Sequence, residues 1–315
     1  MDNLCHTLAG AALARAGLDR RTPLAMPTLL VAANLPDVDV LAYLRDPLFA
    51  LTFRRGWTHG VLAMAVLPVG LAGVMVAWDR MLRLRWRPGA KPAPPRDLLL
   101  VSLVGVLSHS LLDLLNTYGV RLLMPVSDRW FYGDTLFIID AWLSGLLAMA
   151  WLVGWGGRGR ERAGEGRSGS ARRARLVLGL AGLYIGGMFA LGQVARRSAA
   201  REAAAIGIRP ARIMASPVPV DPLRRSVLLD LGGSYRWGSF DWRRPAPRSM
   251  LEPHAIPRNF EHPAVAAALE QPDGRAFRRW SRFPAAATFP GGVRLYDLRY
   301  ADADADSWAS VWVPP

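Results

Sequence analysis

The segment DLLLVSLVGVLSHSLLDLLN, residues 97–116, combines two properties that rarely occur together. It is apolar and long enough to cross a bilayer as a helix, which takes about 20 residues. It also contains Ser108, His109, Asp113 and Asn116. An ionisable side chain at mid-bilayer costs roughly 2.5–3.5 kcal/mol on insertion scales, and such residues therefore indicate a functional site by default. The segment predicts a membrane helix that contributes polar side chains to a site.

Apolar runs on both sides of this segment extend the prediction to a bundle. Four runs are long enough, or nearly so, to span a membrane: Gly60–Leu82, Asp97–Met124, Thr135–Trp155 and Leu176–Ala195. Two shorter runs, Leu4–Leu18 and Leu24–Leu35, predict a hairpin of short helices packed against the others. The fold class that follows is mainly α, a polytopic helical membrane bundle with four long spans and an N-terminal short-helix hairpin.

The positively charged residues alternate with the apolar runs along the chain. The net charge is +14, but the basic residues gather in loops between apolar runs, which argues against a nucleic-acid partner. Residues 15–21, 83–96 and 156–175 carry fifteen basic residues, whereas residues 36–56 and 117–133 carry five. Cytoplasmic loops are the ones enriched in Lys and Arg. We therefore predict a multi-pass protein of the bacterial inner membrane, with the first three segments inside and the C-terminal part outside.

Composition changes after the last apolar run. Residues 156–175 are rich in Gly, Arg and Ser and predict a flexible cytoplasmic linker. The last part has five tryptophans and short strand-like runs, such as Ser226–Leu231, Val293–Leu298 and Ser310–Val313, with a helix near Ala264–Leu269. The predicted division is a helical membrane domain, the linker, a last transmembrane helix and a small β-rich soluble domain outside the membrane: residues 1–155, 156–175, 176–195 and 196–315.

His109 and Asp113 are the core of the predicted site. They are four residues apart and share one helix face, and Asn116 lies near that face. Imidazole and carboxylate on one face are a common pair of zinc ligands. The same two side chains could instead form a hydrogen-bonded pair inside a bundle, and the spacing alone does not decide between these alternatives.

The predicted topology brings further polar residues to the same membrane face. Loop charges alone set that topology, yet it places all candidate ligands at the outer end: His6, Asp37, Asp39, His59, His109, Asp113 and Asp140. A set of three histidines and two or three aspartates fits one or two divalent cations, with zinc the best match, and leaves an open position for water. The single cysteine excludes a Cys-rich zinc site.

Each candidate also has a structural explanation. His6 could be a core histidine bonded to a backbone carbonyl, and His59 could cap a helix or lie at the membrane interface. One of Asp37 and Asp39 could be only a turn residue. Asp140 could be a first-turn residue stabilised by the helix dipole.

The order of these motifs resembles a known family. Over about residues 1–150 the chain is similar to the bacterial inner-membrane metal-dependent hydrolase family (YdjM-like), through His6, Pro36–Asp39, Arg55–His59, Ser108–Asp113 and Asp134–Asp140. The segments Phe277–Pro284 and Val293–Tyr300 look like the C-terminal module of some longer members. The resemblance implies an inner-membrane location and a metal-dependent hydrolytic activity.

A more distant similarity is to the zinc-dependent phospholipase C and P1 nuclease group, which has a His, an Asp, a His and a His-x-x-x-Asp in that order. This likeness implies that Asp37 or Asp39, His59, His109 and Asp113 bind one ion, and that Asp113 bridges to a second ion held by His6. The sequence departs from that group after Asp113, where the further His and Glu ligands are missing. It also has Met1 in place of a ligating N-terminal tryptophan.

Together these features predict a membrane-bound metal-dependent hydrolase. The expected substrate is a phosphoester or other ester of a lipid-like, amphipathic molecule, attacked by a metal-activated water. Asp37 or Asp39 would act as general base or as ligand, and Asn116 would orient a ligand. Two alternatives remain: a non-catalytic metal-binding or ion-path membrane protein, and a membrane-tethered binding protein whose outer domain is the functional part.

Overall fold

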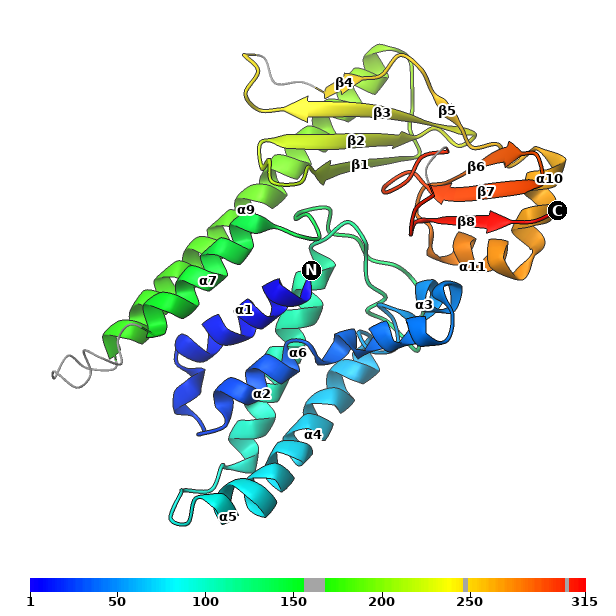
Figure 1. Cartoon of the computed structure of the whole chain (residues 1–315). Helices are drawn as coiled ribbons and strands as arrows, with labels where there is room; N and C mark the ends of the chain where they lie inside the picture. Colours follow the sequence, from blue (N-terminus) through cyan, green and yellow to red (C-terminus); the bar gives the residue numbers. More distant parts are fainter. Residues whose placement is uncertain (156–167, 246–248, 304–305) are drawn as a thin grey trace. The chain divides into compact units, whose positions relative to one another are not determined.

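The computed structural model describes the whole chain except residues 156–167, 246–248 and 304–305 (Figure 1). It divides into two compact units. The helical unit comprises Met1–Asp39, Arg55–Ala190 and Pro219–Asp221. The β unit comprises Val40–Arg54, Leu191–Val218 and Pro222–Pro315.

Helix α6 is the centre of the helical unit. It packs against α4 and α2, while α1 packs against α2 and α7. Its buried positions are spaced three and four residues apart, which gives one continuous stripe along the helix: Leu98, Val101, Ser102, Gly105, Val106, His109, Ser110 and Asp113. The helices that lie wholly in this unit are α1 (Asn3–Arg15), η1 (Leu18–Arg20), α2 (Ala25–Ala32), α4 (Val61–Trp78), η3 (Asp79–Arg83), α5 (Leu84–Trp86), α6 (Pro95–Leu114) and α7 (Ala141–Trp155), and the first part of α9 (Ser168–Ala205) also belongs to it.

Two glycines allow the short N-terminal helices to pack closely. A Cβ atom on Gly105 would overlap the side chain of Ala32, and one on Gly10 would lie 2.8 Å from the carbonyl oxygen of Leu29. Small residues at helix crossings are the usual means of close approach between membrane helices. The predicted hairpin of short helices is therefore held against α6 by backbone proximity.

Three described helices are long and apolar enough to cross a membrane, which corrects the expected four long spans. They are Val61–Trp86, Pro95–Leu114 and Gly169–Ala205. The pair α2 and η2 (Leu35–Leu44), bent by 44°, would raise the number to four if it counts as one broken span.

The run predicted at Thr135–Trp155 is shorter because its first part is not helical. The backbone N–H groups of Thr135 and Leu136 both donate to the carbonyl of Leu115 after the end of α6, at 2.9 and 3.0 Å. Helix α7 starts only at Ala141, where Asp140 Oδ1 accepts the N–H of Leu143 at 2.9 Å. The early residues of the apolar run therefore close the end of one helix instead of beginning the next.

Two other predicted boundaries move. Helix α9 (Ser168–Ala205) extends beyond the predicted Leu176–Ala195 at both ends, so it includes the last residues of the predicted linker. The first part of that linker, residues 156–167, lies outside the described residues. The span predicted at Asp97–Met124 ends as a helix at Leu114.

The β unit contains two antiparallel sheets. The first has the order β1-β2-β3-β4, with β5 also paired to β3, and the second has the order β6-β7-β8. Alternate residues of the first sheet face opposite sides, so Val227 and Leu229 pack on Ala199 of α9, and Leu228 packs with Phe283. The β unit contains the elements α3 (Pro47–Phe53), β1 (Arg212–Pro217), β2 (Arg224–Asp230), β3 (Ser234–Asp241), β4 (Ser249–Leu251), β5 (Ile256–Pro257), α10 (Pro263–Glu270), α11 (Pro272–Trp280), β6 (Pro284–Phe289), β7 (Gly292–Asp297) and β8 (Ser310–Val313).

The predicted C-terminal elements lie where the sequence indicated. The expected strands correspond to β2, β7 and β8, and the expected helix corresponds to α10. The protein is therefore mainly helical with a β-rich C-terminal part, as predicted, although with fewer long spans.

Candidate metal centre

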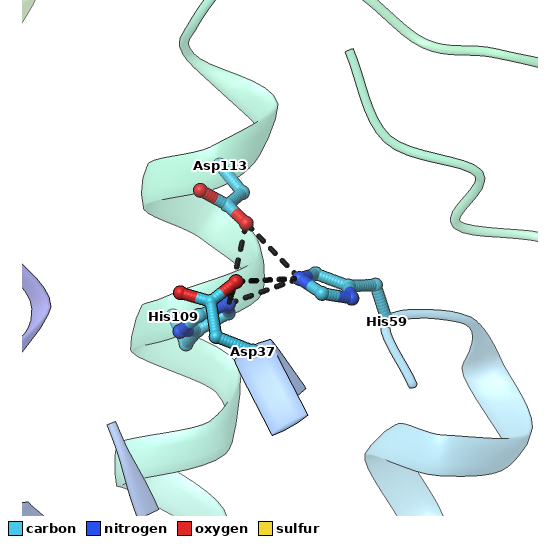
Figure 2. A group of neighbouring side chains, drawn as sticks. All are labelled: Asp37, His59, His109 and Asp113. Atoms are coloured by element: carbon cyan, nitrogen blue, oxygen red, sulfur yellow. Dashed lines mark hydrogen bonds and ion pairs between the residues drawn. The ribbon is translucent and has the colours of Figure 1, made fainter. Parts of the chain in front are cut away.

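Four side chains from three separate segments converge beside α6 (Figure 2). His109 and Asp113 come from the buried stripe of α6, Asp37 from the first turn of η2, and His59 from the residues just before α4. Each contributes one potential ligand atom, and these atoms all lie within 4.8 Å of one another. All four side chains are buried. The i, i+4 spacing in α6 predicted one half of this group, and packing supplies the other half.

The shortest distances in the group join the two imidazoles and Asp113. His59 Nε2 lies 3.0 Å from His109 Nε2, and Asp113 Oδ2 lies 3.1 and 3.2 Å from the two nitrogens. Asp37 Oδ1 is 3.8 Å from each of the same nitrogens. The four atoms therefore face a common point.

Hydrogen bonds on the far side of each ring fix which nitrogen faces that point. The carbonyl of Ala33, which can only accept, lies 2.7 Å from His109 Nδ1, so this nitrogen carries the proton. Thr58 Oγ1 donates to Asp39 Oδ2 at 3.0 Å and therefore accepts from His59 Nδ1 at 2.9 Å. Both Nε2 atoms are left with a lone pair, the arrangement that metal-binding histidines usually have.

Burial favours the neutral imidazole that a metal requires. Desolvation lowers the pKa of His59, against the opposing effect of Asp113. A neutral ring at this position cannot form an ion pair with the carboxylates around it. Its lone pair is instead available to a cation.

An unpaired carboxylate oxygen provides a test of whether the group fits a metal. Asp37 Oδ1 is buried and has no hydrogen-bond partner among the described residues, although it points at two nitrogen lone pairs. A buried carboxylate oxygen facing other electron pairs is costly unless a cation lies between them. Two imidazole nitrogens and two carboxylate oxygens form a common donor set for a first-row divalent cation such as zinc. The residues fit the ion, and the group could hold one.

His6 lies next to this group, on the other oxygen of Asp113. Its Nε2 is 3.2 Å from Asp113 Oδ1, and its ring stacks on that of His109 with centroids 3.8 Å apart. The amino group of Met1 forms an ion pair with the same oxygen. His6 Nδ1 has no hydrogen-bond partner among the described residues. Asp113 is thus shared between His6 and the four-residue group.

Three further predicted site residues do not belong to the four-residue group. Asp39 lies behind His59, where its Oδ2 accepts from the backbone N–H of Arg55 at 2.8 Å. Asn116 Oδ1 accepts the N–H groups of Tyr118 and Gly119 at 2.9 and 3.2 Å, in the turn after α6. Asp140 caps α7 and accepts from the hydroxyl of Tyr184 at 3.1 Å.

Arg55 is the residue at this site that the sequence analysis missed. Its buried guanidinium places Nη1 2.6 Å from Asp113 Oδ2. In the sequence analysis Arg55 is one of the arginines of residues 36–56 and the first residue of the Arg55–His59 motif, without a role in the metal site. Its position four residues before His59 was the available signal, because the intervening segment is too short to carry the two side chains far apart.

Comparisons with known proteins agree with the membrane helices and name the family. Searches against curated proteins and against solved structures found no match. The model of the YdjM inner membrane protein family matches residues 1–195, which include every residue of the candidate metal centre. The chain therefore belongs to the YdjM inner membrane protein family, and its helical unit is that of a membrane protein.

Proposed function

We propose that this protein is a membrane-bound metal-dependent hydrolase that cleaves an ester of a membrane-associated substrate. The observation that carries the proposal is the buried group of Asp37, His59, His109 and Asp113, with all four ligand atoms within 4.8 Å of one another. The family match and the apolar helices support the membrane part of the proposal. The donor set supports the metal part.

The residues of the site have distinct proposed roles. A divalent cation, with zinc as our choice, would supply Lewis-acid activation of the ester and of the attacking water. His59, His109 and Asp113 would hold the ion, and the carbonyl of Ala33 and the hydroxyl of Thr58 orient the two rings. Asp37 Oδ1, which has no hydrogen-bond partner among the described residues, would accept the proton of the attacking water or bind the ion.

His6 supports a second, adjacent cation position. His6 Nε2 lies beside Asp113 Oδ1, whereas the Nε2 atoms of His59 and His109 lie beside Asp113 Oδ2. Asp113 therefore has one oxygen on each side, and His6 would help it to hold a second ion that takes part in the same chemistry. We propose one ion in the four-residue group and a second one beside His6.

We further propose that the metal centre faces the outside of the inner membrane. The basic segments give the orientation, because residues 15–21, 83–96 and 156–175 carry most of the positive charge of the loops. In Figure 1, η1, α5 and the last turn of α7 lie at the end of the helical unit opposite the N-terminus. This arrangement supports a cytoplasmic end of the helical unit with the basic loops and an outer end with the site. The loop charges also predict that the chain after α9 lies outside.

The decisive experiment measures metal and turnover on the same full-length protein in detergent. We expect about one or two ions per chain and hydrolysis of at least one member of a panel of phosphomonoester, phosphodiester and carboxylic-ester lipids. His109→Ala should lose both metal and turnover, whereas His254→Ala, an exposed histidine of the β unit, should lose neither. Stoichiometric metal without turnover of any ester would favour a non-catalytic metal-binding protein. A wild-type protein without metal would contradict the proposal.

Labelling from each side of the membrane tests the orientation. Arg87→Cys and Arg275→Cys place thiols at exposed positions before α6 and in α11, while Cys5 is buried. In intact inner-membrane vesicles of known orientation, an impermeant thiol reagent should reach residue 87 only from the cytoplasmic side. It should reach residue 275 only from the opposite side, and labelling of both from one side would overturn the topology.

A further inference from the structure

Arg55 is held at the metal centre by its backbone as well as by its side chain. Its φ angle of +57° lies in the left-handed region, which is unusual for a residue with a side chain and persists only where surrounding contacts enforce it. Asp39 accepts its N–H at 2.8 Å, and the N–H of Arg121 donates to its carbonyl at 2.8 Å. Strained residues of this kind cluster at ligand sites. The local fold therefore fixes the direction in which the guanidinium extends.

The guanidinium points at the same oxygen that faces the two imidazoles. Arg55 Nη1 is 2.6 Å from Asp113 Oδ2, and the ring of Tyr118 lies 5.3 Å from its guanidinium carbon. A cation held by Asp113 would therefore lie close to a second fixed positive charge. Two like charges at this distance repel strongly in a buried site unless an anion contacts both. Asp113 is one such anion, and the geometry favours a second one from the substrate.

A second arginine adds to the positive character next to Arg55. A Cβ atom on Gly56 would lie 2.5–2.9 Å from the guanidinium of Arg121, so only glycine leaves room for this group beside Arg55. Arg121 is almost fully buried, with its guanidinium carbon 4.9 Å from the ring centroid of Trp130. Guanidinium groups match phosphate oxygens with paired N–H donors, which is why arginine predominates where a planar fork recognises phosphate.

An open pocket of about 410 Å³ lies at the α2–η2 bend, and Asp37 of the candidate metal centre is part of its lining. It is lined by Asn3, Val31, Asn34, Leu35, Asp37 and Val38. Asp37 thus belongs to both the pocket and the four-residue group. The two valines are each 45% exposed, and the α2–η2 pair is apolar enough to count as one broken membrane span. The pocket therefore opens on an apolar surface and has one of the candidate ligands, Asp37, in its wall.

We propose that the substrate is a lipid bearing a phosphate ester. Arg55 binds the phosphate next to the metal ligands, and the α2–η2 pocket takes the part of the hydrocarbon chain nearest the headgroup. In the reaction, the oxygen of water bonds to phosphorus, the P–O bond to the lipid alcohol breaks, and the alcohol leaves with a proton. This inference rests on the proposed hydrolase and narrows its ester to a phosphoester.

Equilibrium binding tests the role of Arg55 without relying on turnover. Calorimetry on the full-length protein in detergent, with metal content measured for each sample, would use inorganic phosphate and dioleoyl phosphatidic acid as probes. Arg55→Gln should weaken both ligands by about 10–100-fold, the range expected for loss of a charge-assisted pair. Arg55→Lys keeps the charge but loses the fork, and it should lie between Arg55→Gln and the wild type. Unchanged binding in Arg55→Gln at unchanged metal content would overturn the proposal.

Filling the pocket separates a lipid from free phosphate. Val38→Trp should weaken dioleoyl phosphatidic acid about tenfold and leave inorganic phosphate unaffected, because only the chain enters the pocket. Val69→Trp on α4, a valine that is 61% exposed and does not line the pocket, is the matched control. Equal loss for both probes, or no loss for the lipid, would overturn the assignment of the pocket to the chain.

The two proposals fail in different ways. Phosphate binding that depends on Arg55, with no hydrolysis of any ester, would contradict the hydrolase and leave the anion site standing. Hydrolysis of neutral carboxylic esters that survives in Arg55→Gln would support the hydrolase and contradict the phosphate assignment.

Discussion

Asp113 in the helical unit and Asp297 in the β unit are both completely buried, and both contact an arginine, yet their surroundings differ in kind. Asp297 accepts from the hydroxyl of Ser281 at 2.6 Å, from the backbone N–H of Arg282 at 2.7 Å and from Arg299 at 2.9 Å. Asp113 instead faces His6, His59 and His109. The backbone and hydroxyl donors around Asp297 stabilise its negative charge without any cation. The imidazole nitrogens that face Asp113 carry lone pairs, so together with the carboxylate they form a set of ligands for a cation.

The difference shows which feature of a buried carboxylate indicates function. Burial and an arginine partner occur at both residues and therefore distinguish nothing. The neighbourhood of Asp113 contains a further carboxylate oxygen, on Asp37, that has no hydrogen-bond partner among the described residues. The chemistry of the neighbours, with two acceptor nitrogens turned inward by Ala33 and Thr58, separates a ligand from a structural anchor.

We expect the largest effect on stability from removing the structural carboxylate, Asp297. Asp297→Ala should destabilise the β unit by about 3–5 kcal/mol, because Arg299 loses its buried carboxylate partner. Chemical unfolding of the full-length protein, followed by tryptophan fluorescence, measures the change. Metal content should stay at the wild-type level, and loss of metal in this variant would mean that the two carboxylates are not independent.

The next largest effect concerns metal affinity, which should depend on the residue that orients His59. Asp39→Asn should lower metal affinity by roughly 10–100-fold, the usual effect of removing a residue that orients a ligand. Asp39 is placed for this role because it accepts from Thr58 and lies 3.4 Å from His59 Nδ1. Competition with a chelator measures the affinity, and Asp241→Asn in the β unit is the control. Complete loss of metal would indicate that Asp39 is itself a ligand.

Acid titration should reveal Asp297 as a structural carboxylate. Burial alone would raise its pKa, but Arg299 and the hydrogen bonds from Arg299 and Ser281 outweigh burial and lower the pKa to about 2. A lowered pKa contributes stability that is present above the ordinary value of 3.8 and is lost as the pH falls through about 2. The contribution is about 2 kcal/mol. Unfolding measured between about pH 4 and pH 2 should show this loss in the wild type and not in Asp297→Asn.

The smallest effect concerns Asp140, which we predicted as a metal ligand from the sequence. Asp140→Ala should cost about 1 kcal/mol, the usual value of a helix cap, and should leave metal content unchanged. The cap on Leu143 and the hydrogen bond from Tyr184 account for this residue. A thermal shift together with metal analysis checks both parts, and reduced metal content would return Asp140 to the site.

Much of the candidate site could be predicted because its residues are polar side chains in or next to strongly apolar segments. His109 and Asp113 interrupt an apolar run at helical spacing, so their shared face follows from helix geometry alone. Loop charges then indicated that His59 and Asp37 belong to the same end of the bundle. In the β unit, alternating and bounded runs were sufficient to place β2, β7, β8 and α10.

The error in the number of long spans comes from the hydrogen bonds that close the end of α6. The predicted span from Thr135 begins late because Thr135 and Leu136 donate to Leu115 at the end of α6, a contact between distant segments that no local pattern encodes. We predicted that Asn116 orients a ligand because it lies near the face of His109 and Asp113, and that Asp140 is a ligand because the topology places it at the same end of the bundle. In the structure both accept backbone N–H groups at chain turns.

Hydrophobic periodicity and misplaced polar residues are local properties, so the membrane helices, the β-rich C-terminal part and the residue types available for a cation follow from the amino-acid sequence. Packing between distant segments selects the aspartates that face the imidazoles and brings Arg55 to them. These choices depend on where α2 ends and how closely it approaches α6 at Gly105. The direction of a side chain across a helix contact is set by packing, which no single segment specifies.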